Sequence, residues 1–179
     1  MLPSQINDMT HMSCNLFAMK VVEELRYLVL AIQREGNRLL AAELRPLGIT
    51  PSQAEVLRVL RDHGPLTLNA LGGLLVCETG NSPSRLVDRL VAQGSVKRGI
   101  DKVDRRYLAL SLTPQGRALH RRIVTAENRL HRTMNDLVAG YPLDETIATL
   151  RAVADAFPAG AALARRRDPE YDHTLAQER

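Results

Sequence analysis

The amino-acid sequence predicts a mainly α-helical protein that carries one small antiparallel β-hairpin. Three helix starts are marked by a hydroxyl residue followed by proline, at Thr50-Pro51, Ser82-Pro83 and Thr113-Pro114. The hydroxyl residue can cap the helix, and proline at the first helical position loses no hydrogen bond. Elsewhere apolar residues recur at threes and fours, whereas the alternation of a strand occurs near residues 107–112. A chain of 179 residues is most simply one domain with its own core.

The first expected elements are a loose arm and a long helix. Residues 1–12 are polar and rich in methionine, and we expect a loose N-terminal arm there. A helix is expected over about 13–44, because apolar residues keep helical spacing until a proline and a glycine end it. A second helix begins after Thr50, where Gln53 completes a capping box, and it ends before His63-Gly64-Pro65.

A pair of shorter helices and a hairpin follow. Thr67 opens the first helix of the pair, and the second runs from Ser82 to Gly94 with polar residues opposite one apolar stripe. Strands are expected at 95–99 and 107–112, around a charged tip at 100–106. The stripe residues are Leu86, Val87, Leu90 and Val91, and the second strand should turn Leu108, Leu110 and Leu112 inward.

Two further helices are expected at the C-terminal end, from Thr113 to about Ala139 and from Leu143 to about Ala164, before a polar tail at 165–179. A compact core of some seventy residues does not need such long flanking helices, whose apolar seams must be buried somewhere. We therefore expect 13–44 and 114–164 to be dimerisation helices that pack against a second copy. An ordinary bundle within one chain is the alternative.

An exposed polar helix followed by a basic hairpin is typical of a winged helix-turn-helix, expected here over about 50–113. The net charge is only +4, but residues 81–106 hold seven basic residues against three acids. Arginines of the helix could read guanine, and the hairpin could reach phosphate or the minor groove. Asp88 should orient Arg85 or Arg89, and Asp104 should brace a wing arginine. The expected DNA contacts are Ser82, Ser84, Arg85, Arg89, Lys97, Arg98, Lys102, Asp104, Arg105 and Arg106. A merely solvated charged face is the alternative.

The run SRLVDRLVAQGSVKR, the following DRR and then LALSLTPQG resemble the MarR family of bacterial transcription regulators. The resemblance extends upstream through LGITPSQAEVLRVLRDHGPLTLNALGGLL and covers about Leu47 to Leu119. It implies a two-fold dimer held by terminal helices on a pseudo-palindromic duplex DNA operator, with the DRR contacting DNA. The chain departs from the family pattern in a longer turn at 76–81 and in Gly72-Gly73, expected inside the preceding helix.

Two regulatory mechanisms are implied by the resemblance. MarR-like regulators release DNA when a small, often phenolic, molecule binds or when a thiol is oxidised. For a ligand, the expected pocket lies between the first two helices and the helix after the hairpin, with Arg26, Tyr27 and Arg61 lining it. For oxidation, the segment around Cys14 resembles that of the peroxide-sensing cysteine in the organic-hydroperoxide branch. Cys77 precedes the helix from Ser82 to Gly94, which is the expected recognition helix, that is, the helix that contacts the DNA bases. Both cysteines could instead be buried apolar fillers.

Enzyme chemistry finds little support in the sequence. There is no Walker phosphate loop, no dinucleotide glycine fingerprint and no nucleophile elbow. His120 and His131 would lie about 16 Å apart along one helix, too far to share a metal, so we expect surface roles for both. We expect no catalytic residue, metal or cofactor. A thiol-dependent enzyme using either cysteine and an adaptor that binds only protein remain as alternatives.

The sequence contains no apolar run of membrane-spanning length, no signal-peptide pattern and only two distant cysteines. We therefore expect a cytoplasmic protein with no membrane partner. The sequence predicts a dimeric repressor that a phenolic-type ligand releases from its operator, with thiol-based redox sensing as the alternative.

Overall fold

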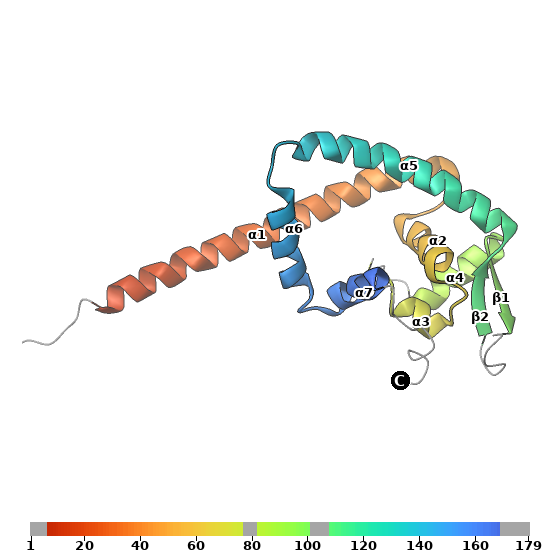
Figure 1. The fold of residues 1–179 in the computed structure, drawn as a ribbon, viewed down its shortest axis with the longest axis horizontal. Coiled ribbons are helices and arrows are strands. Elements are labelled where there is room, and N and C mark those ends of the chain that lie inside the picture. Colours follow the sequence, from red (N-terminus) through yellow and green to blue (C-terminus); the bar gives the residue numbers. More distant parts are fainter. Residues whose placement is uncertain (1–6, 77–81, 101–107, 169–179) are drawn as a thin grey trace, which may run out of the picture. The chain divides into compact units, whose positions relative to one another are not determined.

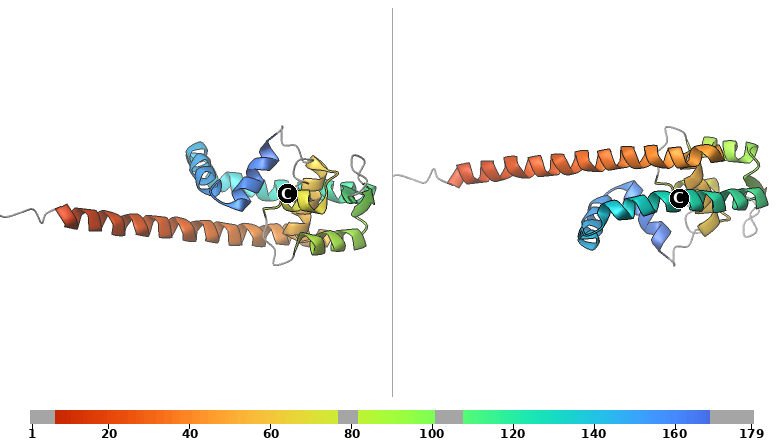
Figure 2. Two further views of the ribbon diagram at one scale, coloured as in Figure 1. Left: turned by 90° about the horizontal axis from the view of Figure 1, so that it is seen from below. Right: turned by 90° about the horizontal axis from the view of Figure 1, so that it is seen from above.

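The computed structural model describes the backbone of residues 7–76, 82–100 and 108–168, and side chains from residue 20 onward. The chain divides into two compact units, Met1–Leu39 and Leu40–Arg179. The first unit consists of most of α1 (Asn7–Leu44), which Figures 1 and 2 show as one unbroken helix. The helix thus begins before the expected position near Ser13, and residues 7–12 are helical, not a loose arm.

The second unit is a small helical domain with a two-stranded sheet (Figure 1). Strand β1 pairs antiparallel with β2, from Val96 opposite Leu112 to Ile100 opposite Leu108. Leu66 adds a bridge to Leu110 on the other side of β2. The elements of this unit after α1 are η1 (Arg45–Leu47), α2 (Pro51–His63), α3 (Leu68–Gly72), α4 (Pro83–Ala92), β1 (Val96–Ile100), β2 (Leu108–Leu112), α5 (Pro114–Val138), α6 (Leu143–Ala154) and α7 (Pro158–Arg167).

Helices begin at all three hydroxyl–proline pairs, but only two of the three hydroxyl groups make a cap bond. The capping box of α2 is complete, since the Gln53 amide donates to Thr50 Oγ1 at 3.3 Å and the Thr50 amide to Gln53 Oε1 at 2.9 Å. Thr113 caps α5 by accepting from the Gly116 amide at 3.0 Å. Ser82 occupies the cap position of α4, but its hydroxyl lies 2.8 Å from that of Ser84 and makes no cap bond.

The core of the second unit lies where α2, α4, α5 and β2 meet. The expected apolar faces of α2 and α4 are buried in it, with Val91 only partly covered. One expectation was wrong, because Leu108 is 60% exposed. It pairs with Ile100 at the far end of the hairpin, beyond the core, and the neighbouring Ala109 is buried instead. The core residues from these elements include Val56, Leu57, Leu60, Leu86, Val87, Leu90, Leu110, Leu112, Ile123 and Ala126.

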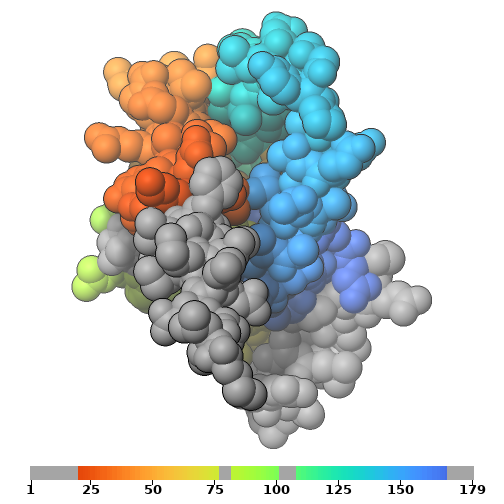
Figure 3. Space-filling view, turned by 90° about the vertical axis from the view of Figure 1, so that its left-hand side faces the viewer, coloured from red at the N-terminus to blue at the C-terminus, as the bar shows by residue number. Residues whose placement is uncertain are grey.

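The C-terminal region forms two helices instead of the single one expected over 143–164. Helix α6 ends at Ala154 and α7 begins at Pro158, after Phe157 in an extended conformation. Proline disfavours helical geometry in the preceding residue, which explains the break. The residues at 165–167, expected in a polar tail, are helical. Figure 3 shows the end of α5, α6 and α7 as a continuous part of the surface.

A glycine lets α7 approach the end of α6 closely. A Cβ on Gly160 would lie 1.9 Å from the carbonyl oxygen of Ala154, so only glycine fits there. Of the two glycines expected inside the preceding helix, Gly72 is the last residue of the short helix α3, and Gly73 lies just after it as the C-cap. Within the described residues no helix is both long enough and apolar enough to cross a membrane.

Candidate nucleic-acid interface

Helix α4 presents a polar face to solvent and an apolar face to the core. Arg85, Asp88 and Arg89 are exposed, whereas Leu86 and Leu90 on the opposite side are buried. Ser82 is also exposed, and Ser84 is partly buried. This placement is the one that the apolar stripe predicts. It leaves two guanidinium groups free of the core, on the same helix face.

An ion pair joins α4 to the first strand of the hairpin. Arg98 Nη2 lies 2.6 Å from Asp88 Oδ1, with the two side chains 42% and 58% exposed. Asp88 therefore binds a residue of β1, and not Arg85 or Arg89 as expected. An exposed pair of this kind adds little to stability, typically about 0–1 kcal/mol. The pair shows that β1, which also carries the exposed Lys97, lies next to the polar face of α4.

The tip of the hairpin and one cysteine lie outside the described residues. This concerns Lys102, Asp104, Arg105 and Arg106, and also Cys77, which precedes α4 in the sequence. Cys14 falls within α1, but its side chain is not among those described. The roles expected for these residues stay predictions.

A network that the sequence pattern did not reveal holds the end of α3. The Val76 amide donates to Glu55 Oε1 of α2 at 2.8 Å, and Arg166 of α7 forms an ion pair with the same carboxylate. Arg165 donates to the carbonyl oxygen of Gly73 through Nε at 3.1 Å and Nη2 at 2.8 Å. The signal in the sequence was Pro158 followed by three arginines at 165–167, which we had assigned to a tail.

Helix α5 is tied to the rest of the unit by ion pairs. Arg58 of α2 pairs with Glu127, and Arg129 Nη2 lies 2.7 Å from Glu43 Oε2. His120 lies on the same helix, and its Nε2 is buried without a hydrogen-bond partner among the described residues. Burial is the main cause that lowers the pKa of His120 below its ordinary 6.5, with Arg58 and Arg61 adding to the effect and Asp62 opposing it. A purely surface role for His120 was therefore wrong.

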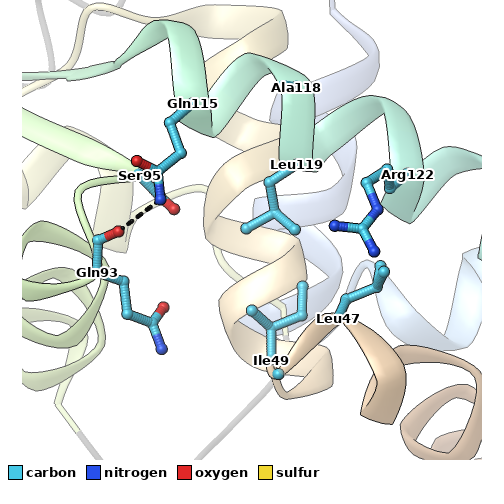
Figure 4. A pocket seen from close by; sticks show the side chains of 9 residues that line it. Leu47, Ile49, Gln93, Ser95, Gln115, Ala118, Leu119 and Arg122 are labelled. Atoms are coloured by element: carbon cyan, nitrogen blue, oxygen red, sulfur yellow. Dashed lines mark hydrogen bonds between the residues drawn. The ribbon is translucent and has the colours of Figure 1, made fainter.

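A cavity of about 430 Å³ opens where the end of η1 and the residues just after it, together with the connection between α4 and β1, face the start of α5 (Figure 4). Gln115 crosses its edge and donates to the carbonyl oxygen of Gln93 at 3.0 Å. Leu119 points toward Ile49, and the Arg122 guanidinium lies beside Leu47 (Figure 4). The lining residues are Leu47, Gly48, Ile49, Gln93, Ser95, Gln115, Ala118, Leu119 and Arg122. The cavity thus combines aliphatic walls, two amides and one cation.

A second cavity of about 210 Å³ shares Leu47 and Arg122 with the first. The pocket residues expected from the sequence are placed differently. In the first unit the Arg26 guanidinium lies over the Tyr27 ring, 4.2 Å from its centroid. Arg61 of α2 is exposed and lines neither of these two cavities. Their joint role in one pocket stays a prediction.

No group of three or more metal-binding side chains occurs among the residues whose positions are described. The histidines at 120 and 131 lie on α5, and neither belongs to a group of this kind among the described residues.

Comparison with known proteins shows which family the sequence and the fold resemble. The profile of the MarR family matches residues 49–108. The multiple antibiotic resistance protein MarR of Salmonella typhimurium is 34% identical over 92 residues, which are 51% of this chain and 63% of that protein. The match thus spans less than two thirds of that relative. The organic hydroperoxide resistance transcriptional regulator of Bacillus subtilis is 30% identical over 106 residues, 59% of this chain and 71% of that protein.

Solved structures agree with the sequence relatives. A mutant of MarR from E. coli, complexed with operator DNA, has a TM-score of 0.66 and 27% identity over 74% of this chain and 94% of that one. The MepR–DNA complex of S. aureus has the same TM-score with 23% identity, over 74% and 97% of the two chains, and supports the fold alone. On the family profile and these relatives, the chain belongs to the MarR family.

Proposed function

We propose that this protein is a sequence-specific DNA-binding transcriptional regulator. The observation that carries the proposal is the exposed polar face of α4, with Arg85 and Arg89, beside the basic strand β1. The organic hydroperoxide resistance relative is a transcriptional regulator, and the structure of a mutant E. coli MarR was obtained with operator DNA. In a bacterial cell such a regulator works in the cytoplasm, where the DNA is.

In this proposal α4 enters the major groove and the hairpin lies along the neighbouring backbone or minor groove. Arg85 and Arg89 supply two-pronged donors for guanine O6 and N7. Lys97 stands on β1 for phosphate, and Arg98 sets the angle between helix and strand through its pair with Asp88. At the hairpin tip Lys102, Arg105 and Arg106 make phosphate or minor-groove contacts, and Asp104 braces an arginine.

The regulator acts as a homodimer on a pseudo-palindromic operator. Support comes from large apolar side chains left in solvent by a single chain, such as Ile32 at 64%, Leu137 at 72% and Phe157 at 59% exposure. These belong to α1, to the end of α5 and to the segment between α6 and α7, the expected dimerisation helices. Burying them between two copies removes apolar surface from water and presents two α4 helices to successive major grooves.

A small anionic or phenolic molecule acts as the effector and releases the repressor from DNA. The cavity between η1 and α5 supports this, because Arg122 offers a cation and Leu119 an apolar wall within the same space. A ligand there would favour one placement of α5 against the end of α4, through Gln115 and Gln93. Operator affinity falls if that placement no longer suits two successive grooves, which is a shift between existing states.

Thiol oxidation is the alternative control. Peroxide should then weaken operator binding and a reducing agent should restore it, and only the sensing position should abolish the response when replaced. Cys14→Ser and Cys77→Ser separate the two candidates. If the double variant responds to peroxide like the wild type, neither thiol is the sensor. A thiol-dependent enzyme is distinguished by turnover of a thiol substrate without preference for duplex DNA.

The proposal is tested by selecting bound fragments from genomic DNA with the purified protein. We expect enrichment of a short inverted repeat, and release of the protein from that sequence by a phenolic acid or by peroxide. Arg122→Ala should remove the response to the acid while leaving binding to free operator unchanged. Enrichment of no common sequence would contradict a sequence-specific regulator.

A further inference from the structure

The C-terminal helix α7 is bound to the end of α3, which is the first helix of the helix-turn-helix pair. Arg165 donates twice to the Gly73 carbonyl, and Arg166 Nε donates to the carbonyl oxygen of Leu74 at 2.5 Å. Both arginines are partly buried. Carbonyl groups at a helix C-terminus have no partner within the helix and carry partial negative charge, so guanidinium groups are well suited to bind them.

Glu55 joins this contact to the chain that leads into α4. One carboxylate oxygen, Oε1, both pairs with Arg166 Nη2 and accepts the Val76 amide. The side chains of Arg166 and Glu55 are only 17% and 9% exposed, so water screens their interaction much less than at the surface. Val76 and Ser82 flank residues 77–81, which connect α3 with the recognition helix.

Helix α7 is itself held against α6. Phe157 donates its amide to the Ala154 carbonyl at 2.9 Å, and the missing side chain of Gly160 allows the close approach of the two helices. A change in the position of α6 must therefore be followed by α7. Arg165 and Arg166 link α7 to the carbonyl groups of Gly73 and Leu74, so a movement of α7 also moves the segment that leads from α3 to α4.

We propose that Arg165, Arg166 and Glu55 form a positioning latch, the α7 latch, which sets the entry of the chain into the recognition helix. The proposal rests on the proposed DNA-binding function and assigns to it three residues that do not contact DNA. Removing an arginine of the latch removes hydrogen bonds to the carbonyl groups at the end of α3. Helix α4 can then take up more than one orientation relative to the rest of the domain. Specific operator binding, which needs one placement, then loses more than non-specific binding to phosphate.

Three single substitutions in α7 test the latch. Arg165→Ala and Arg166→Ala remove a latch contact. Arg167→Ala removes the same charge from the same helix, but this exposed side chain makes no hydrogen bond or ion pair with another described residue. Glu55→Gln keeps an acceptor for the Val76 amide and removes the charge that binds Arg166. Far-ultraviolet circular dichroism establishes that each variant is folded.

The first measurement is amide hydrogen exchange of the free full-length protein at Leu74 and Val76. In Arg166→Ala we expect exchange at these amides to be faster by about tenfold or more, the scale on which losing one hydrogen bond to a charged group acts. Glu55→Gln should fall between this variant and the wild type, and Arg167→Ala should match the wild type. Unchanged exchange in Arg165→Ala and Arg166→Ala would overturn the latch, whether or not the protein binds DNA.

The second measurement is fluorescence anisotropy with the selected operator and a scrambled duplex over a salt series. Latch variants should bind the operator about tenfold more weakly, bind the scrambled duplex as the wild type does, and keep the salt slope. A slope lowered by about 1 would show that the arginine contacts phosphate and would overturn the positioning role. Faster exchange with unchanged operator affinity would also overturn it. A wild type without DNA affinity would instead refute the proposed function.

Discussion

At the scale of single residues, Arg85 is the position where sequence and structure agree most closely. The helical pattern predicts it on the polar face of α4, and the structure exposes it there. For the nearby Asp88, the helical pattern predicts an exposed position but not the ion-pair partner, because several arginines are close to it in sequence. Only the fold brings Arg98 of β1 within 2.6 Å of it.

Arg85→Ala is expected to weaken binding at one base position. Losing a two-pronged contact to guanine costs about 1–3 kcal/mol and relaxes the preference for that base. Affinities for operators with each base substituted in turn provide the measurement. Arg121→Ala, which removes the same charge from an exposed position on α5, is the control and should leave the base preference unchanged. If Arg85→Ala lowered the affinity for every operator sequence by the same factor, Arg85 would contact phosphate and not a base.

His120 makes stability depend on pH. Burial, with Arg58 and Arg61, lowers its pKa, so the unfolded chain binds the proton more readily than the folded chain. The free energy of unfolding therefore falls as the pH drops below about 6.5. His120→Gln does not titrate, and its loss of stability between pH 7.5 and 5.5 should be smaller than that of the wild type. Urea unfolding at both pH values checks this, and an identical loss in both proteins would contradict it.

At the scale of elements, the junction of hairpin and α5 depends on one glycine. A Cβ on Gly116 would lie 2.0 Å from the carbonyl oxygen of Ser95, which also accepts the Thr113 amide at 3.1 Å. Backbone atoms cannot move aside as a flexible side chain can. The start of α5 therefore lies directly on the start of β1, and the cap residue Thr113 secures both.

Gly116→Ala should destabilise the protein by about 1–3 kcal/mol, as overpacking of a tight contact does. Gly99→Ala is the matched control, because that glycine lies in β1 with nothing within 4 Å of an added Cβ. Thermal unfolding of the two variants provides the comparison. Equal stability of the two would mean that α5 can move away from β1 without cost.

The elements also show how far the sequence could be interpreted. Hydroxyl–proline starts and apolar periodicity gave α2, α4, α5 and the hairpin nearly at their observed bounds. The break at Pro158 was missed because the apolar spacing of α6 continues through Phe157. The latch was missed because it depends on contacts between α7, α2 and α3, which lie far apart in sequence. Local patterns predict elements, but not such long-range partners.

At the scale of the whole molecule, the expected dimer explains the exposed apolar helices. Replacing Leu150 or Phe157, 41% and 59% exposed, with Glu should give a monomer and abolish tight operator binding, because one half-site supplies only part of the contact. Sedimentation velocity measures the mass, and circular dichroism distinguishes a folded monomer from an unfolded chain. A monomeric wild type that binds an inverted repeat tightly would contradict the dimer.

The proposed function requires that α4 and the hairpin together bind duplex DNA. Fluorescence anisotropy of the wild type, Arg105→Ala and Arg106→Ala over a salt series tests it most directly, on the operator and a scrambled duplex. We predict weaker binding to both duplexes and a salt slope lower by about 1 per half-site for each lost phosphate contact. If both arginines can be removed without a change in affinity or salt slope, the hairpin does not contact DNA, and the proposed joint binding of DNA by α4 and the hairpin is wrong.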